Sequence, residues 1–257
     1  WDIGTGVTGY VWHAARPRAA LLLLHGHGDY AQRYVNQNNR LIPHLLDLGV
    51  SVNAFDLWGN GRSPGVRGVI DVRQAVADHL AARRKLQGES LPVFLLGHSL
   101  GGLITATSVL RDESGVRGVI LLSPAIKYPV PAPVRLLARV VGSLAPALPT
   151  PIPTGQMDSL THDPEAALKL SSDPLMYLGP IRWLTSAGAA AFAHDNWALY
   201  PQMRVPLLVI HGTADKNTNP QGSRQLIEVA ASGDKTLHLV EGGLHALLDD
   251  TRRDETL

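Results

Sequence analysis

The sequence predicts an α/β protein with a mostly parallel central sheet flanked by helices, and with a small helical cap inserted after the sixth strand. Three observations support this fold class. The chain has 257 residues, 45% of them hydrophobic, which is enough for one sizeable core. Short apolar runs alternate with longer segments of helical period. The alternation stops after Ser123 and resumes near Val205, and most of the 18 prolines lie between these points.

The predicted strands are short and nearly continuously apolar, as expected for strands buried on both faces of a sheet. They span residues 19–24, 50–55, 92–96, 119–122, 207–210 and 236–240. An antiparallel hairpin between Trp1 and His13 is expected at one edge, and counting it as two strands makes 119–122 the sixth. Amphipathic stretches at 34–48, 71–87, 100–111 and 221–231 are predicted helices.

Residues 125–204 are predicted to form the cap, with 1–124 and 205–257 forming the core. Prolines divide this insertion into short pieces, so it does not resemble another regular strand–helix unit. Its portion 130–148 is apolar and carries Arg135 and Arg139 but no acidic residue. We expect a cap helix packed on the core. The alternative is a lipid-facing surface that makes transient contact with a membrane or micelle and admits a greasy substrate.

Composition excludes several classes of function. The net charge of +1 gives no electrostatic reason to expect a nucleic-acid partner, and the cluster Arg83-Arg84-Lys85 is interpreted as the solvated face of a helix. Cysteine is absent, which excludes disulfides, thiolate catalysis and cysteine-ligated metals.

Localisation and assembly are less constrained. The longest apolar runs fall far short of the roughly 20 residues that span a bilayer, and no signal peptide is recognisable. A soluble protein is therefore expected. The sequence does not determine its compartment, and the cytoplasm is slightly favoured. The chain begins with Trp1 rather than Met, consistent with loss of an upstream piece. Nothing in the sequence determines the oligomeric state.

The segment Gly97-His98-Ser99-Leu100-Gly101 fits the G-x-S-x-G pattern of a nucleophile elbow, a sharp turn between strand and helix typical of the α/β-hydrolase fold. The turn strains the serine backbone and lifts its hydroxyl clear of the chain. Glycine is needed two residues to either side, because a side chain there would collide with a neighbouring strand or helix. A predicted strand precedes the motif and a predicted helix follows it, so Ser99 is the candidate nucleophile.

A serine hydroxyl needs a base to take its proton, and the base needs a carboxylate to orient it. In this fold the order along the chain is serine, acid, histidine. Asp215 and His245 follow two successive predicted strands and satisfy that order. Eleven histidines compete for the role of base. His98 belongs to the elbow and is expected to point away, and His211 is expected to pin a loop through hydrogen bonds. The rival acids Asp234 and Asp249 are disfavoured because the first precedes a strand and the second follows the histidine.

Acyl transfer also requires fixed N–H donors where negative charge develops on the substrate oxygen. The backbone amide of Leu100 is one candidate, and the amide of His27, in the glycine-rich loop after strand 19–24, is the other. His25 and His27 lack a third ligand of suitable spacing, so no metal is expected.

Several segments together resemble the monoacylglycerol lipase and lysophospholipase branch of the α/β-hydrolases, over nearly the whole chain. They are His25-Gly26-His27-Gly28-Asp29-Tyr30 with Arg33-Tyr34, Phe55-Asp56-Leu57-Trp58-Gly59-Asn60-Gly61-Arg62-Ser63, Gly97-His98-Ser99-Leu100-Gly101-Gly102, Leu121-Leu122-Ser123-Pro124-Ala125, Asp173-Pro174-Leu175 and His211-Gly212-Thr213-Ala214-Asp215-Lys216. The resemblance implies hydrolysis of a single-acyl-chain ester through an acyl-enzyme, without a cofactor. It places Ser99, Asp215 and His245 on the triad, and the amides of His27 and Leu100 in the oxyanion hole.

The departures from the family pattern concern the substrate rather than the triad. Tyr30, Trp58 and Asn60 replace the usual histidine, arginine and histidine, and Leu244 and Ala246 replace residues that often flank the catalytic histidine. The resemblance makes a monoacylglycerol the leading substrate, and the alternatives are a lysophospholipid, a short-chain carboxylic ester or acyl transfer to an alcohol. A catalytically inactive binding protein on the same fold is the alternative from a different class.

Overall fold

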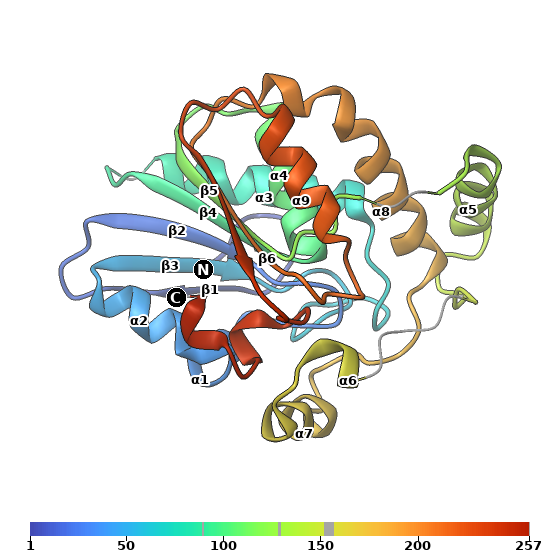
Figure 1. Ribbon diagram of the computed structural model, residues 1–257, viewed down its shortest axis with the longest axis horizontal. Helices are drawn as coiled ribbons and strands as arrows, with labels where there is room; N and C mark the ends of the chain where they lie inside the picture. Colours follow the sequence, from blue (N-terminus) through green and yellow to red (C-terminus); the bar gives the residue numbers. More distant parts are fainter. Residues whose placement is uncertain (89, 128–129, 152–156, 257) are drawn as a thin grey trace.

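The computed structural model describes residues 1–88, 90–127, 130–151 and 157–256. Within that part the strands form one seven-stranded sheet in the order β1-β3-β2-β4-β5-β6-β7 (Figure 1). The strands are β1 (Gly9–Trp12), β2 (Ala19–Leu24), β3 (Val50–Phe55), β4 (Val93–His98), β5 (Val116–Leu122), β6 (Leu207–Gly212) and β7 (Lys235–Val240). Only β1 runs antiparallel to its neighbour β3, and every other pair is parallel. The predicted fold class is confirmed.

The amino-terminal segment differs from its prediction. It lies at an edge of the sheet as expected, but it contributes a single strand instead of a hairpin. The insertion consequently follows β5, the fifth described strand. The other strands contain the predicted ranges, except that β4 begins at Val93, since proline at position 92 has no N–H to donate to the ladder.

Two layers of helices cover the sheet, and the alternation of side chains along β2 shows how. Leu22 and Leu24 lie on the face of the sheet that α3 (Val72–Gln87), α4 (Leu100–Arg111) and α9 (Pro220–Val229) cover. Leu21 and Leu23 face the opposite layer, which contains α2 (Leu41–Asp47) and the carboxyl-terminal segment. Both layers exclude water from β2, whose six residues are all buried.

The predicted helix 34–48 is broken in the structure. It divides into α1 (Arg33–Asn36), the 3-10 turn η1 (Asn38–Arg40) and α2. Asn38, Asn39 and Arg40 all have φ near +50°, a left-handed conformation that asparagine tolerates better than most residues. The N–H of Asn38 is satisfied by the carboxylate of Asp249, 2.6 Å away.

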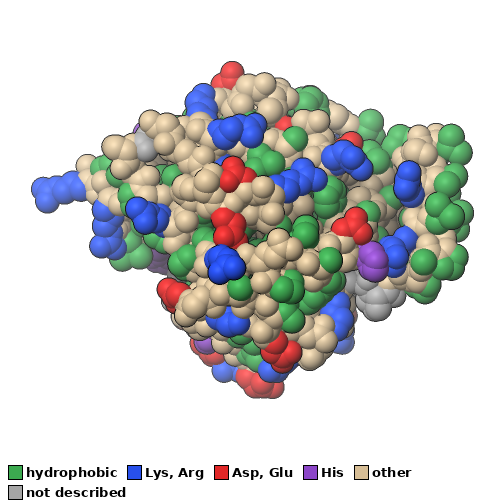
Figure 2. Space-filling model, turned by 90° about the horizontal axis from the view of Figure 1, so that it is seen from above, with side chains coloured by type: hydrophobic (Ala, Val, Ile, Leu, Met, Phe, Trp, Pro, Cys, Tyr) green, Lys and Arg blue, Asp and Glu red, His purple; other side chains and the backbone are tan. Residues whose placement is uncertain are grey.

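The insertion between β5 and β6 contains α5 (Ala132–Leu144), α6 (Met157–Leu160), α7 (Pro164–Ser172) and α8 (Trp183–Asp195), followed by the 3-10 turns η2 (Asn196–Ala198) and η3 (Tyr200–Gln202). Helix α5 packs against α8 through the buried residues Ala138 and Gly142. The expectation that this helix packs on the core is therefore wrong. Its large apolar side chains are exposed, and Figure 2 shows hydrophobic groups gathered over the projecting end of the molecule that α5 forms.

The interpretation of the basic cluster in α3 is also wrong for one of its members. Arg84 and Lys85 are exposed, but Arg83 is only 1% exposed. Its guanidinium donates to the carbonyl oxygens of Ser108 and Asp112 at the end of α4. The carbonyl groups at the end of a helix lack partners within that helix, so a buried arginine can satisfy them. No helix in the described part of the chain is long and apolar enough to cross a bilayer.

Candidate active site

Ser99 lies at the tight turn that joins β4 to α4. Its φ of 55° and ψ of −118° place a non-glycine residue in a sparsely populated conformation. The flanking glycines permit this turn. A Cβ on Gly97 would lie 2.5 Å from the Gly101 carbonyl oxygen, and a Cβ on Gly101 would lie 2.3 Å from the His25 carbonyl oxygen. The collisions anticipated from the pattern thus involve α4 on one side and the chain after β2 on the other.

Among the three residues predicted as a triad, His245 lies in hydrogen-bond reach of both Ser99 and Asp215. His245 Nε2 is 2.9 Å from Ser99 Oγ, and His245 Nδ1 is 2.7 Å from Asp215 Oδ2. Ser99, Asp215 and His245 follow β4, β6 and β7, whose carboxyl ends meet at one edge of the sheet. The arrangement can pass a proton from a serine hydroxyl to an imidazole that a carboxylate orients.

Asp215 is buried and accepts several hydrogen bonds. Its Oδ1 accepts from the N–H groups of Asn217 (2.7 Å) and Thr218 (3.0 Å), and its Oδ2 accepts from the Thr218 hydroxyl (2.8 Å). Burial acts to raise the pKa of the Asp215 carboxyl, but the neighbouring His245 and the hydrogen bonds from His211, His245 and Thr218 outweigh burial and hold the pKa well below its ordinary value. The Asp215 carboxylate is therefore ionised in the folded protein at neutral pH.

The competing histidines are occupied elsewhere. His211 Nδ1 lies 2.6 Å from the Ser223 hydroxyl, and its Nε2 lies 3.2 Å from both Thr218 Oγ1 and Asp215 Oδ2, so it ties the loop of the acid to α9. His98 Nε2 lies 3.4 Å from the His245 carbonyl oxygen, away from Ser99. Burial, and then the proximity of His245, lowers the pKa of His98 to about 4.

The rival acids also lie outside the Ser99–His245–Asp215 chain. The side chain of Asp249 pairs with Arg33 and accepts the N–H of Asn38, and Asp234 is exposed at the start of β7.

The residues whose amides are predicted as oxyanion donors, His27 and Leu100, line the same cavity as Ser99. Among the described residues, the N–H groups of His27 and Leu100 have no hydrogen-bond acceptor. The carbonyl of Gly26, in the same peptide unit as the His27 N–H, accepts from His25 Nδ1 at 2.7 Å. Because a trans peptide points its N–H opposite to its carbonyl, this bond orients the His27 amide.

His25 is a further residue of the candidate site, and the sequence prediction missed its role there. Its Nε2 accepts the N–H of Leu57 at 3.0 Å, which places the ring proton on Nδ1, where it serves the Gly26 carbonyl. The G-x-S-x-G pattern carries no signal for this role, because the partner Leu57 lies after a different strand. No group of three histidine, aspartate or glutamate side chains suited to a metal ion occurs in the part of the chain that the structure describes.

A cavity of about 620 Å³ opens over Ser99. Ser99, His27, Leu100 and His245 line its base, and most of its walls come from the insertion. Apolar wall residues are Val130, Met157, Leu160, Met176, Leu178, Ile181, Ala189 and Ala190. Polar wall residues from the insertion and from the loop after Asp215 include Asp158, Ser159, Lys216 and Asn217. The wall residues could not be assigned from the sequence, because no motif marks them.

The positions that depart from the family pattern shape the loops beneath this cavity. The Tyr30 hydroxyl donates to Asp173 at 2.6 Å, which joins the loop after β2 to the insertion. Asn60 Oδ1 accepts the N–H of Gly28 at 2.9 Å, one residue beyond His27. Trp58 is half-buried against the core of the sheet. Hydrogen bonds of Tyr30 and Asn60 thus hold the loop that carries His27, whereas Trp58 packs against the core.

The mostly parallel sheet, with a strained serine at the turn after β4, defines an α/β-hydrolase. The chain belongs to the family described as serine aminopeptidase S33, whose model matches residues 15–252. Human monoglyceride lipase is 31% identical over 90% of this chain and 76% of its own length. Monoacylglycerol lipase of Mycolicibacterium smegmatis is 30% identical over 91% of this chain and 83% of its own. The crystal structure of Paleococcus ferrophilus monoacylglycerol lipase superposes with a TM-score of 0.85 at 31% identity, covering 96% of this chain and 95% of that one. The protein is a lipolytic serine ester hydrolase.

Proposed function

We propose that the chain cleaves a carboxylic ester with a single acyl chain, such as a monoacylglycerol, through an acyl-enzyme on Ser99. One observation carries the proposal. The aligned Ser99, His245 and Asp215, with the free amides of His27 and Leu100, open onto a largely apolar cavity. Every group that acyl transfer requires therefore faces the space in which a fatty chain can lie.

The chemistry follows from the distances. His245 Nε2 takes the proton of Ser99 Oγ as the oxygen attacks the ester carbonyl carbon. The carbonyl electron pair moves onto its oxygen, which accepts hydrogen bonds from the amides of His27 and Leu100. Collapse of this intermediate breaks the bond to the alcohol, which takes the proton back from His245. Water then repeats the sequence on the acyl-enzyme and releases the carboxylic acid. Asp215 holds His245 in the required tautomer throughout.

The substrate class rests on the cavity and on the relatives. Each methylene that moves from water into an apolar cavity contributes about 0.8 kcal/mol to the free energy of binding, so the walls favour a long acyl chain over a short one. The human and mycobacterial relatives named above are a monoglyceride lipase and a monoacylglycerol lipase. We propose that residues 125–204 are a cap that supplies most of this apolar wall to a core of 1–124 and 205–257.

Labelling and turnover test the proposal. A fluorophosphonate probe is expected to label the wild type, and Ser99→Ala is expected to lose both labelling and hydrolysis. Ser143→Ala, at an exposed serine of α5, is the matched control and should retain both. Labelling that persists in Ser99→Ala would exclude Ser99 as nucleophile, and an unlabelled, inactive wild type would favour a binding protein.

A second assay defines the substrate. On p-nitrophenyl esters from acetyl to palmitoyl and on a monoacylglycerol, kcat/KM is expected to rise with chain length and to be high for the monoacylglycerol. A maximum at acetyl would instead indicate a short-chain carboxylesterase. Product analysis with glycerol present distinguishes hydrolysis from acyl transfer.

We further propose that α5 makes transient contact with the lipid surface from which substrate is drawn. Val134, Leu136, Leu137, Val140 and Leu144 are between 46% and 81% exposed. Arg135 and Arg139 lie among them, and no acidic residue does. An exposed apolar helix with basic residues is suited to an anionic bilayer.

Vesicle flotation tests this contact. The wild type is expected to float with vesicles that contain phosphatidylglycerol, and Leu136→Asp with Leu137→Asp to lose at least fivefold of that binding. Leu48→Asp, at an exposed leucine outside the cap, is the control. Equal flotation of the double variant and the wild type would contradict the contact.

A further inference from the structure

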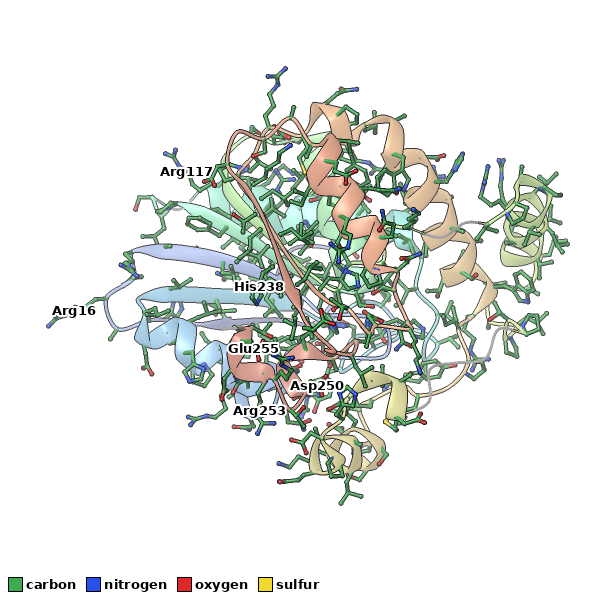
Figure 3. The ribbon with its side chains drawn as sticks, in the orientation of Figure 1. Arg16, Arg117, His238, Asp250, Arg253 and Glu255 are labelled. Atoms are coloured by element: carbon green, nitrogen blue, oxygen red, sulfur yellow. The ribbon has the colours of Figure 1, made fainter. Side chains whose placement is uncertain are left out.

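The buried carboxylate of Asp250 lies five residues beyond His245, outside the triad and outside the cavity lining. Its side chain is fully buried and accepts hydrogen bonds from two directions. Oδ2 accepts the N–H of Leu244 at 2.9 Å, and Oδ1 accepts the N–H groups of His162 (2.9 Å) and Thr251 (2.8 Å). Figure 3 shows Asp250 on the carboxyl-terminal segment, beside the α6 and α7 region of the cap.

These bonds act on the backbone immediately around His245. Leu244 precedes His245, and its amide is held by Asp250. Ala246 follows His245, and its amide donates to the Leu160 carbonyl of α6 at 2.8 Å. The imidazole therefore projects from a short segment fixed on both sides, once by Asp250 and once by the cap.

The other side of Asp250 reaches the cap directly. The N–H of His162, in the turn between α6 and α7, donates to Oδ1, and the half-exposed ring of His162 places Nδ1 3.1 Å from the same oxygen. Nearby, Arg253 donates to Asp163 at 2.7 Å, and the Thr161 hydroxyl donates to the Asp249 carbonyl at 2.9 Å. Asp250 is thus the point at which the histidine loop and the α6–α7 turn share one acceptor group.

The carboxylate is in the charged form that this role needs. Burial acts to raise the pKa of Asp250, but the N–H groups of Leu244, His162 and Thr251 outweigh burial and hold the pKa below its ordinary value. A charged acceptor makes stronger hydrogen bonds than a neutral one. Because each oxygen accepts from a different segment, a side chain with a single acceptor oxygen cannot satisfy both.

We propose that Asp250 is a positioning residue that sets the orientation of His245 and joins the histidine loop to the cap. The inference rests on the proposed role of His245 as the base for Ser99. It gives the cap a part in catalysis in addition to its part in binding the acyl chain, because the α6–α7 turn holds the same carboxylate that holds Leu244.

Asp250→Asn is the sharpest test, since it keeps the size of the side chain and turns one acceptor oxygen into a donor. We expect kcat on a p-nitrophenyl ester to fall by about 30-fold while KM stays within twofold, because a misplacement of about 1 Å can cost about 100-fold in rate. The rate of fluorophosphonate labelling should fall by the same factor, since it depends on the same proton transfer from Ser99.

The neighbouring carboxylate provides the matched control. Asp249 is similarly buried, but it pairs with Arg33 and Asn38 and does not contact the histidine loop through its side chain. Asp249→Asn is expected to lower the melting temperature and to leave kcat of the folded enzyme within threefold. If both variants lower kcat equally, or if Asp250→Asn acts on KM alone, the positioning role is wrong.

Two further measurements separate the outcomes. If Asp250→Asn does not fold, Asp250→Ser replaces the carboxylate with a single smaller hydroxyl, whose proton can rotate away from the amides, and it must still slow labelling at least fivefold. If the wild-type enzyme is labelled at Ser99 and both Asp250 variants react as fast as the wild type, the inference alone is overturned. Wild-type enzyme that neither hydrolyses esters nor reacts with the probe overturns the proposed function, whatever the Asp250 variants do.

Discussion

The backbone of Ser99 shows how single residues impose the geometry of the site. A φ of 55° is unfavourable for serine, and it persists because β4 and α4 fix the chain on both sides. Gly97 and Gly101 contribute by the absence of a Cβ, which allows α4 to approach β4 and the end of β2. The reactive hydroxyl is therefore held in place before any substrate binds.

Gly101→Ala tests this close approach. The added Cβ would lie 2.3 Å from the His25 carbonyl oxygen and 2.4 Å from that of Leu24, both of them backbone atoms that cannot move aside cheaply. We expect the free energy of unfolding to drop by about 3 kcal/mol, measured by urea denaturation. Gly233→Ala, where a Cβ meets nothing within 4 Å, should change stability by less than about 0.5 kcal/mol. Equal effects at the two positions would contradict the argument.

Asp215→Asn tests the proposed acid. The amide cannot hold the His245 Nδ1 proton, so the imidazole adopts the wrong tautomer and its Nε2 no longer accepts the proton of Ser99. We expect kcat to fall by about 10³- to 10⁴-fold, measured on a p-nitrophenyl ester. The control is Asp234→Asn, the exposed rival, which should remain within twofold of wild type. Full turnover by Asp215→Asn would refute the assignment.

At the scale of elements, the sheet could be predicted from sequence and some of the helices could not. Strand β2 is a run of six apolar residues, a pattern typical of a strand that is buried on both faces of a sheet. At the break between α1 and α2, the Asn38 N–H donates to the carboxylate of Asp249, which is 211 residues away along the chain, so a local pattern cannot predict the break. The exposure of α5 likewise depends on where α8 lies, which its own pattern does not encode.

The residues of the candidate site likewise divide into those that could be predicted from sequence and those that could not. Ser99, Asp215 and His245 could be proposed from sequence because each follows a strand, and parallel strands bring their carboxyl ends to one edge. His25 and Asp250 could not, because their function lies in backbone amides that come from other loops. A hydrogen bond to a backbone group places no requirement on the partner's side chain, so it leaves no motif.

Tyr177, in the cap, contacts the loop that carries His27, and its influence on that loop can be measured. Its amide donates to the Gly28 carbonyl at 2.8 Å, and its ring lies edge-on to His27 with centroids 5.6 Å apart. The ring also covers Gly68, where a Cβ would lie 2.1 Å from a ring carbon. Tyr177 therefore packs directly on the residue whose amide is the proposed oxyanion donor.

Tyr177→Ala is expected to loosen the His27 amide and to lower kcat by about tenfold, less than the 10²- to 10³-fold that follows complete loss of an oxyanion donor. The inhibition constant of a trifluoromethyl ketone, which forms a tetrahedral adduct with Ser99, should rise by the same factor. Tyr177→Phe keeps the ring and loses only its bond to the Pro180 carbonyl, so it should stay within twofold. A loss of ketone affinity shared equally by Tyr177→Phe would show that the hydroxyl, rather than the ring, is responsible.

At the scale of the whole molecule, the cap is bonded to each loop that carries a proposed catalytic group, apart from the turn that carries Ser99 and Leu100. The Tyr177 amide donates to Gly28, the Asn217 side-chain amide donates to the Ser159 carbonyl at 3.0 Å, and the Ala246 amide donates to the Leu160 carbonyl. These contacts link the oxyanion, acid and histidine loops to one insertion. Changes in the cap should therefore alter rate as well as substrate affinity.

Three histidines that are buried or partly buried, His27, His79 and His98, give the whole molecule a predictable response to acid. Burial is the main cause that lowers the pKa of His27 to about 4, of His79 to about 3 and of His98 to about 4. In the unfolded chain each takes up a proton near pH 6.5, whereas the folded protein binds it only below these values. Protonation thus favours the unfolded state, and stability is lost as pH falls from about 6.5 toward 4. The loss is at most about 1.4 kcal/mol per pH unit for each histidine.

Urea denaturation between pH 8 and pH 4.5 measures this slope, and His79→Gln isolates one of its contributions. His79 lies between α3 and α4, where its Nδ1 is 2.8 Å from the Ser108 hydroxyl, and glutamine can keep a hydrogen bond there without titrating. We expect the variant to be less stable than the wild type at pH 8 but to lose stability less steeply below pH 6.5. An identical slope in the two proteins would show that His79 takes up its proton at the same pH in the folded and the unfolded state, because only a difference in proton uptake between the two states makes stability depend on pH.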